Sequence, residues 1–227
     1  MRPVPAGYRG LWRRTLLQAG KLRDTTSTVY WLQTDRWHAD IRIPAGRPSF
    51  EGVASLAQCS QAQRRFLARQ QGFCGLTEVD DTSRPDICRW HRIADFQPPA
   101  LKPDAGAMHF AGDLLVETGI HDDYLEHWER LPGSDREATV LAHDEASGDL
   151  LLRAGDWIMR VVPRRAPWPG KCPPGISLEA VMAPGCMDET ALLDFEISLL
   201  RITDIGWTIA HSTLPWLEGG LILFDES

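Results

Sequence analysis

The sequence predicts an all-β fold built mainly from antiparallel strands, and three features of the chain support this prediction. Short segments rich in apolar, β-branched and aromatic residues recur along the 227 residues, and such residues suit a pleated, half-buried surface. Several segments alternate apolar and polar residues with a period of two, as a strand with one buried face does. Glycine, proline and aspartate turns separate them at short intervals, which favours a barrel or a sandwich.

The strands of the first half are set by this alternation. Residues 37–43 are the clearest case, because Trp37 and Ile41 alternate with His38 and Arg42. Residues 25–33 precede them and form a predicted hairpin with them. The other predicted strands of this half are residues 8–17, 73–79, 87–96, 107–110, 114–117 and 124–130.

One convincing helix interrupts the strands of the first half. Residues 55–70 place Leu56, Phe66 and Leu67 at spacings that share one helical face. Gly72 follows closely and is expected to end the helix.

The turn at residues 131–134 is the best candidate for an internal boundary. We therefore predict a barrel half over residues 1–130 and a second β-rich half over residues 131–227, so that the chain forms two barrel-like halves with one or two short helices. Residues 176–182 suit either a short helix or a strand. The predicted strands of the second half are residues 138–143, 149–153, 157–162, 195–203, 207–212 and 220–224.

Composition excludes some classes of partner. Apolar residues make up 43% of the chain and charged residues 24%, which is ordinary for a globular protein. The formal net charge of −7 gives no general attraction to nucleic acid, whose phosphates are contacted by lysine and arginine. We therefore expect no nucleic-acid partner.

The sequence also predicts no membrane partner. The first ten residues lack the apolar stretch of a secretory signal, and no apolar run approaches the roughly 18 residues needed to cross a bilayer. The five cysteines form no C-x-x-C pair, which favours reduced thiols over a disulfide framework or a zinc site. We expect a cytoplasmic protein without a bound metal.

A short motif opens the first predicted strand. Gly10 and Trp12 form a G-x-W sequence there, which resembles the first-strand signature of the lipocalin and fatty-acid-binding superfamily, the calycins. The resemblance implies a lipocalin-like β-barrel in which the tryptophan plugs one end and an arginine from a late strand packs across its ring. Arg201 is the candidate for that arginine. The alternative is a core tryptophan that follows a turn glycine.

A second resemblance covers a longer stretch. Residues 24–44, DTTSTVYWLQTDRWHADIRIP, resemble a strand–turn–strand segment of a fungal family of casein-kinase-interacting, lipocalin-like proteins, which has bacterial relatives of uncharacterised function. The resemblance covers residues 8–96 best and implies two lipocalin-like barrel halves. It carries over no catalytic residue, because the family has no established chemistry.

Two polar clusters on predicted strands are the candidate ligand-binding residues. His38, Arg42 and Trp37 are the candidates on the first strand, where His38 and Arg42 lie on the face opposite Trp37. Because barrel interiors are more often apolar, the alternation favours solvent for this polar face. If it faces the barrel interior instead, Arg42 could pair with a ligand carboxylate. Trp90 and His91 mark the second cluster, where the tryptophan could form part of an aromatic wall.

Three functions remain open from the sequence. The leading hypothesis is a non-enzymatic binding protein whose cavity takes a small apolar or amphipathic molecule, oriented by Arg42 or His38 between tryptophan walls. The second is a protein-interaction module that meets a protein partner through an apolar patch or a loop such as residues 164–175. The third is a haem carrier or an enzyme that uses His91 or His127. No hydrolase elbow or nucleotide-binding motif occurs, and the sequence identifies no cofactor.

Overall fold

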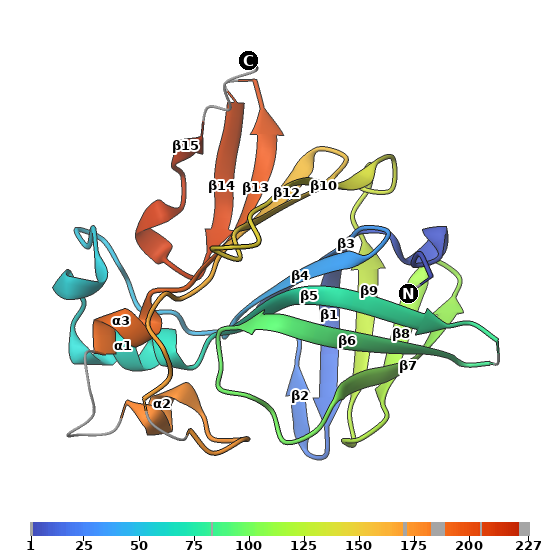
Figure 1. Cartoon of the computed structure of the whole chain (residues 1–227), viewed down its shortest axis with the longest axis horizontal. Helices are drawn as coiled ribbons and strands as arrows, with labels where there is room; N and C mark the ends of the chain where they lie inside the picture. The colour runs from blue at the N-terminus through green and yellow to red at the C-terminus, as the bar shows by residue number, and fades with distance from the viewer. Residues whose placement is uncertain (1, 83, 170–171, 183–188, 205, 223–227) are drawn as a thin grey trace.

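The computed structural model describes residues 2–82, 84–169, 172–182, 189–204 and 206–222. Two antiparallel sheets make up the molecule, and the predicted all-β class is confirmed. Figure 1 shows the larger sheet rolled into a barrel and the smaller sheet rising from its side. The predicted strand at residues 220–224 is described only up to residue 222, and Cys186 lies outside the described residues.

The first sheet is an eight-stranded barrel in which consecutive strands pair and β9 returns to β1. Trp12 on β1 pairs with Arg130 on β9 and closes the ring. The short β2 (Leu22–Asp24) extends the end of β1 as a hairpin. The barrel strands are β1 (Gly10–Ala19), β3 (Thr28–Gln33), β4 (Trp37–Ile43), β5 (Gln71–Asp80), β6 (Asp86–Asp95), β7 (Asp104–Ala111), β8 (Leu114–Gly119) and β9 (Leu125–Arg130).

The second sheet is six-stranded, and its strands also pair in sequence order. Within the described residues its first and last strands do not pair with each other, so this half is an open sheet where we expected a second barrel-like half. Its strands are β10 (Ala138–His143), β11 (Leu150–Ala154), β12 (Trp157–Val162), β13 (Glu196–Thr203), β14 (Gly206–Ser212) and β15 (Leu221–Ile222).

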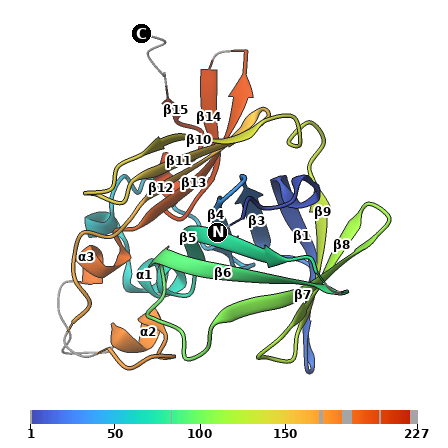
Figure 2. The ribbon, with the colours of Figure 1, turned by 45° about the vertical axis from the view of Figure 1, so that its right-hand side comes forward.

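Short helices gather at one side of the molecule, below the second sheet (Figure 2). They are α1 (Gln61–Ala68), α2 (Leu178–Val181) and α3 (Glu189–Leu193), together with 3-10 turns at Ala6–Tyr8, Leu56–Gln58 and Pro215–Leu217. None of the helices in the described ranges is both long and apolar enough to cross a membrane.

The helix predicted over residues 55–70 is shorter than expected. Ser60 begins α1, because its hydroxyl accepts a hydrogen bond from the backbone N–H of Gln63 while the Gln63 side chain accepts one from the Ser60 N–H. This reciprocal capping fixes the first turn. The preceding residues form a separate 3-10 turn. Of the two alternatives for residues 176–182, the structure has the helix, α2, which covers Leu178–Val181, and α3 was not predicted.

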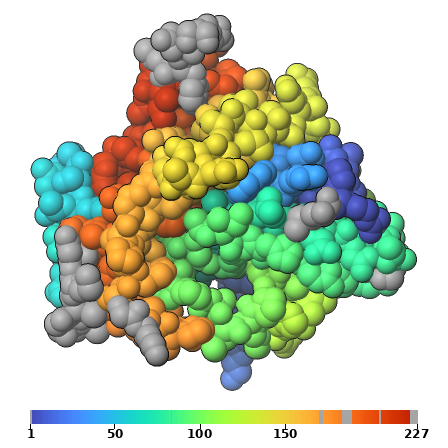
Figure 3. All heavy atoms as spheres, viewed as in Figure 1, coloured from blue at the N-terminus to red at the C-terminus, as the bar shows by residue number. Residues whose placement is uncertain are grey.

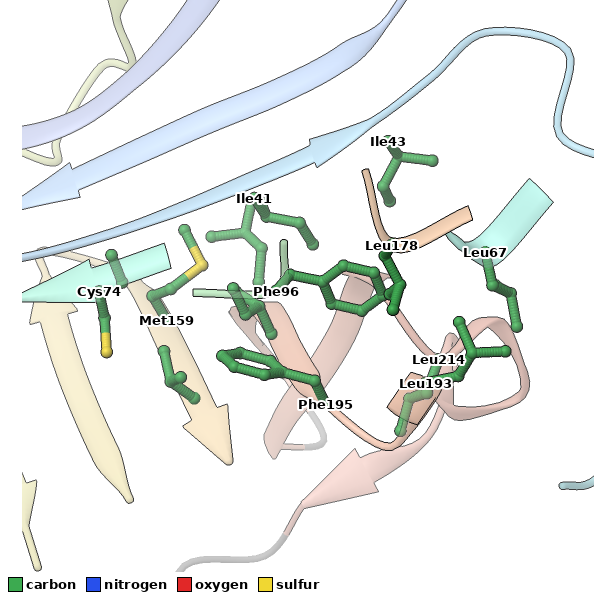
Figure 4. Close-up of a cluster of buried hydrophobic side chains, with 14 of the residues drawn as sticks. Ile41, Ile43, Leu67, Cys74, Phe96, Met159, Leu178, Leu193, Phe195 and Leu214 are labelled. Carbon is green, nitrogen blue, oxygen red and sulfur yellow. The ribbon is translucent and has the colours of Figure 1, made fainter. Parts of the chain in front are cut away.

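The largest apolar core lies between the outer wall of the barrel and the second sheet. Ile41 on β4 and Leu32 on β3 face outward and pack in the same cluster as Met159 and Ile197 of the second sheet. Figure 4 shows Ile41 and Met159 in this cluster, with Phe96 and Phe195 between the two sheets and the helices. The apolar face of β4 is therefore buried against the second sheet, and its polar face points into the barrel.

A second apolar cluster fills one end of the barrel interior. Tyr8, from the 3-10 turn before β1, packs there with Trp12 and donates a hydrogen bond to Asp86 at 2.7 Å. The indole N–H of Trp12 donates to the Tyr8 carbonyl at 2.8 Å. This end of the barrel is closed by side chains. The remaining members of the cluster are Val4, Val29, Trp31, Phe73, Val79, Cys88, Trp90, Met108, Leu115 and Trp128.

The arginine over Trp12 is Arg130, and the prediction of Arg201 is wrong. The Arg130 guanidinium lies 4.9 Å from the centre of the Trp12 ring, whereas Arg201 lies over Trp157 in the second sheet at 5.3 Å. The reason is topological, because the barrel closes at β9 rather than at a C-terminal strand. Gly10 allows the close approach, since a Cβ there would lie 3.1 Å from both Arg130 and Ser134, and its φ is +127°.

Candidate functional site

The barrel contains a cavity of about 310 Å³ at the end opposite Tyr8 and Trp12. Its wall is made by residues near the C-terminal ends of β1, β4, β6 and β8 and the N-terminal ends of β5, β7 and β9. Figure 3 shows a small hollow among the green segments of the barrel, with the blue of the N-terminal strands behind it. A cavity of this size belongs to the small end of the range for ligand sites.

Aromatic rings form the floor of the cavity. Trp31, Trp90, Trp128 and Phe73 all line it. Trp31 meets Trp90 at 5.7 Å between ring centres and Trp128 at 5.9 Å, with interplanar angles of 79° and 72°. These edge-to-face contacts are favourable and fix the rings relative to one another. The floor of the cavity is therefore a rigid apolar surface.

Buried hydrogen bonds orient the Trp31 ring. Its indole N–H donates to the side-chain oxygen of Gln33 at 3.2 Å, and the hydroxyl of Thr77 donates to the same oxygen at 2.7 Å. His38 Nδ1 lies 3.0 Å from that hydroxyl. Since the hydroxyl proton is committed to Gln33, Nδ1 donates to Thr77 and the neutral tautomer carries its proton there.

His38 is held neutral by its surroundings. Burial, followed by the charge of Arg92, lowers its pKa from 6.5 to about 3. Nε2 is buried and has no hydrogen-bond partner within the described chain. A neutral imidazole avoids placing an unpaired charge in the barrel interior.

We expect His38 to make the protein less stable in acid. Below its ordinary pKa of about 6.5 the unfolded chain takes up a proton that the folded chain refuses down to about pH 3. As the pH is lowered across this window, the free energy of unfolding should therefore decrease, and this residue should contribute up to about 1.4 kcal/mol per pH unit. His38→Asn keeps a donor for Thr77 but does not titrate. Urea denaturation over this window should show that the free energy of unfolding of the variant decreases less steeply on acidification than that of the wild type. Equal pH dependence of the two proteins would contradict the assignment to His38.

Two arginines form the charged wall above the aromatic floor. Arg42 donates to both carboxylate oxygens of Asp40, at 2.8 and 3.2 Å. Arg92 donates twice to Asp104, at 3.0 and 2.6 Å, and once to Asp95 at 2.8 Å. Arg92 lies 3.6 Å from the centre of the Phe73 ring, a cation–π contact that joins the wall to the floor.

A third arginine, which does not line the cavity itself, binds a carboxylate of the wall. Arg14 on β1 donates to Glu126 at 2.6 Å and to Asp24 at 3.0 Å. Arg42 also lies 3.6 Å from the same Glu126 oxygen. The side chains of Arg14 and Glu126 are only 7% and 3% exposed, so these pairs are desolvated and fixed in place.

Among the carboxylates that line the cavity, Glu117 is the one that forms no ion pair within the described residues. Its two oxygens accept hydrogen bonds from the Tyr124 hydroxyl at 2.7 Å and from the Trp128 indole at 3.0 Å. No lysine or arginine of the described residues lies within ion-pair distance of it. Burial, then the neighbouring Glu126, raises the pKa of Glu117 from 4.5 to about 8.

The predicted ligand-binding residues do not gather at one place. Arg42 and Trp90 line the cavity, and His38 is buried inside the barrel beside Phe73. The prediction that the polar face of β4 meets solvent is wrong, because the second sheet covers the opposite, apolar face. Trp37 lies on that outer face against His143, 4.5 Å between ring centres. His91 is half exposed, 3.4 Å from Glu78 on the barrel exterior.

Sequence reasoning did not place Glu117 or Glu126 at a ligand site. Glu126 and Trp128 stand two apart on β9 and share its inner face, and Glu117 has the same relation to Leu115 on β8. The alternation of side chains along these two strands can be seen in the sequence, but only the closed barrel shows which face points into its interior. Among the described residues no three histidine, cysteine, aspartate or glutamate side chains gather as a potential metal site.

Comparison with known proteins gives one structural likeness. No family model matches the chain, and no curated protein matches it. The crystal structure of the uncharacterised protein YLR301w from Saccharomyces cerevisiae is similar, with a TM-score of 0.58 and 14% sequence identity over 89% of this chain and 84% of that one. At this identity the likeness shows a shared fold and nothing about activity.

Proposed function

We propose that the protein is a lipocalin-like binding protein that takes a small amphipathic molecule into the barrel cavity. The observation that carries the proposal is the cavity itself, which sets a floor of four aromatic rings against a wall of fixed ion pairs. An apolar body would rest on Trp31, Trp90 and Trp128. A polar head group would meet the wall of Asp40, Arg42 and Glu126.

The side chains of the cavity are already ordered, so little conformational entropy is lost when a ligand binds. The rings are held by edge-to-face contacts, and the charged side chains are held by one another. Few side chains therefore need to be ordered when a ligand enters, which favours affinity. The volume of about 310 Å³ suits a compact molecule rather than a long acyl chain.

The closed end supports the lipocalin-like part of the proposal. Gly10, Trp12 and Arg130 supply the glycine, the plugging tryptophan and the arginine over its ring that the calycin resemblance implies. Localisation in the cytoplasm stays a prediction. Buried free thiols at Cys59, Cys74 and Cys88 are compatible with it.

A bulky residue on the cavity wall should block binding. Ala19 lines the cavity, whereas its neighbour Gln18 is exposed and does not. We expect Ala19→Trp to weaken binding of small phenyl compounds by about tenfold or more, because the indole takes up part of the small cavity, and Gln18→Trp to leave it unchanged. The probes are 2-phenylethylamine, 2-phenylethanol and phenylacetate, followed by calorimetry and by quenching of tryptophan fluorescence. If none of the three binds, or if both variants bind as the wild type does, the proposed function is wrong.

A further inference from the structure

We propose that the ligand of the barrel cavity carries a protonated amine, and that Glu117, beside Glu126 and the Trp128 indole, binds this cation. The inference rests on the proposed function and names its ligand class. Three features of the cavity carry it: the balance of charges on its wall, the prior commitment of both arginines, and the position of Glu117 against an aromatic floor.

Carboxyl groups outnumber cations on the cavity wall. Its guanidinium groups are those of Arg42 and Arg92. Its carboxyl groups are those of Asp40, Asp104, Glu117, Asp122 and Glu126. Asp40, Asp104, Asp122 and Glu126 are each paired with a basic side chain, namely Arg42, Arg92, Lys102 and Arg14. Among the described residues, Glu117 is therefore the carboxyl of this wall that lacks a cation, and when ionised it attracts a cation and repels an anion.

Neither arginine of the wall is free to receive an anionic ligand. Arg42 makes a bidentate pair with Asp40 and lies near Glu126. Arg92 is held by Asp95 and Asp104. A ligand carboxylate would have to displace a protein carboxylate from one of these pairs and leave it buried without a partner, which is strongly unfavourable. Recognition of a ligand carboxylate by Arg42 is therefore disfavoured.

Glu117 differs from the two arginines, because its charge is not paired when it is ionised. It is buried on the cavity wall without an arginine or lysine partner among the described residues. Tyr124 and Trp128 each donate to one of its oxygens. Each carboxylate oxygen has a second lone pair, so Glu117 can accept from a further donor. An ammonium group in the cavity would supply both the donor and the missing positive charge.

The aromatic floor suits the same cation. Trp128 joins the carboxylate to the floor, since its ring lines the cavity and its N–H binds Glu117. Glu117 lies at the N–H edge of this ring, so the indole positions the carboxylate, and a cation–π contact would come from the ring faces of the floor. The wall already uses this contact, because Arg92 lies over the Phe73 ring at 3.6 Å.

Binding of an amine should release a proton. Burial and the neighbouring Glu126 raise the pKa of Glu117, which favours its protonated form in the empty cavity. The incoming ammonium keeps its own proton, Glu117 gives its proton to the buffer, and an ion pair forms. The titratable and charged groups that face Glu117 are Glu126 on β9, Tyr124 before it, Asp104 on β7, Arg42 on β4 and Cys88 on β6.

Calorimetry at neutral pH tests the inference on the full chain. The amine, 2-phenylethylamine, should bind about tenfold more tightly than the neutral 2-phenylethanol, and phenylacetate more weakly than both. Comparing phosphate with Tris buffer should show release of about one proton for the amine and none for the alcohol. Glu117→Gln should abolish the proton release and the preference for the amine over the alcohol. Glu129→Gln, at a half-exposed position on the adjacent strand β9, should change neither.

The outcomes separate the inference from the proposed function. If the alcohol or phenylacetate binds as tightly as the amine and Ala19→Trp weakens that binding, the cavity is a ligand site but the inference is wrong. If none of the three probes binds, the proposed function itself fails. If Glu117→Gln does not fold, as judged by near-ultraviolet circular dichroism, the buffer dependence of the wild type decides alone. Tighter amine binding without proton release would also contradict the assignment to Glu117.

Discussion

Replacing Arg14 with methionine is expected to lower the free energy of unfolding by about 3–5 kcal/mol. Arg14 joins Glu126 and Asp24, at 2.6 and 3.0 Å, in a part of the barrel from which water is largely excluded. The variant would retain the apolar stem but leave Glu126 with only the longer 3.6 Å contact to Arg42. The loss is dominated by the cost of a buried charge without its close partner, rather than by the net contribution of the pair.

The neighbouring residue gives a matched control. Arg13 also pairs with a carboxylate of β9, Glu129 at 3.0 Å, but these side chains are 49% and 50% exposed. Arg13→Met should therefore change stability by no more than about 1 kcal/mol. Guanidinium chloride denaturation of both variants measures the difference. Equal effects would mean that the Arg14 site is hydrated in solution and that the cavity wall is not fixed by it.

These ion pairs also explain why the polar face of β4 can point inward. Asp40 and Arg42 neutralise each other, and Arg14, Glu126 and Arg42 form a continuous set across β1, β4 and β9. Buried charges are tolerated when they are paired and hydrogen-bonded. The same pairs leave Glu117 without a cation.

Strand positions were predictable because alternation is a local property. Residues 37–43, 138–143 and 157–162 coincide with β4, β10 and β12. The inward face of β4 was not predictable locally, because both of its faces are buried: Ile41 packs against the second sheet and Asp40 lies inside the barrel. Which face meets which core depends on strands more than one hundred residues away in the sequence.

The same limit applies to the functional residues. Arg42 and Trp90 were predicted for a ligand site and lie at the cavity. Glu117 and Glu126 carry no sequence motif, and their chemistry arises from burial and from partners on other strands. Arg201 was chosen for its late place in the chain, whereas the ring contact needs the strand that closes the barrel, which brings Arg130 to Trp12.

Replacing Phe96 with alanine is expected to cost about 3–5 kcal/mol of stability, because it opens a cavity in a fully buried aromatic contact. Phe96 follows β6 of the barrel and meets Phe195, which precedes β13 of the second sheet, at 5.8 Å and 64°. Arg164 joins them, since it donates to the Phe96 carbonyl at 2.8 Å and lies over both rings. The barrel and the second sheet therefore share this core.

A double-mutant cycle measures how strongly the two halves are coupled. Phe96→Ala and Phe195→Ala should be non-additive by about 0.5–1.5 kcal/mol, the magnitude of an edge-to-face pair. Leu200→Ala is the control, because Leu200 packs in a separate cluster with Ile158 and Ile209, and its effect should add to that of Phe96→Ala within about 0.5 kcal/mol. If the core unites the halves, every variant unfolds in a single transition. Two transitions, with Phe195→Ala moving only one of them, would show that the barrel holds its cavity without the second sheet.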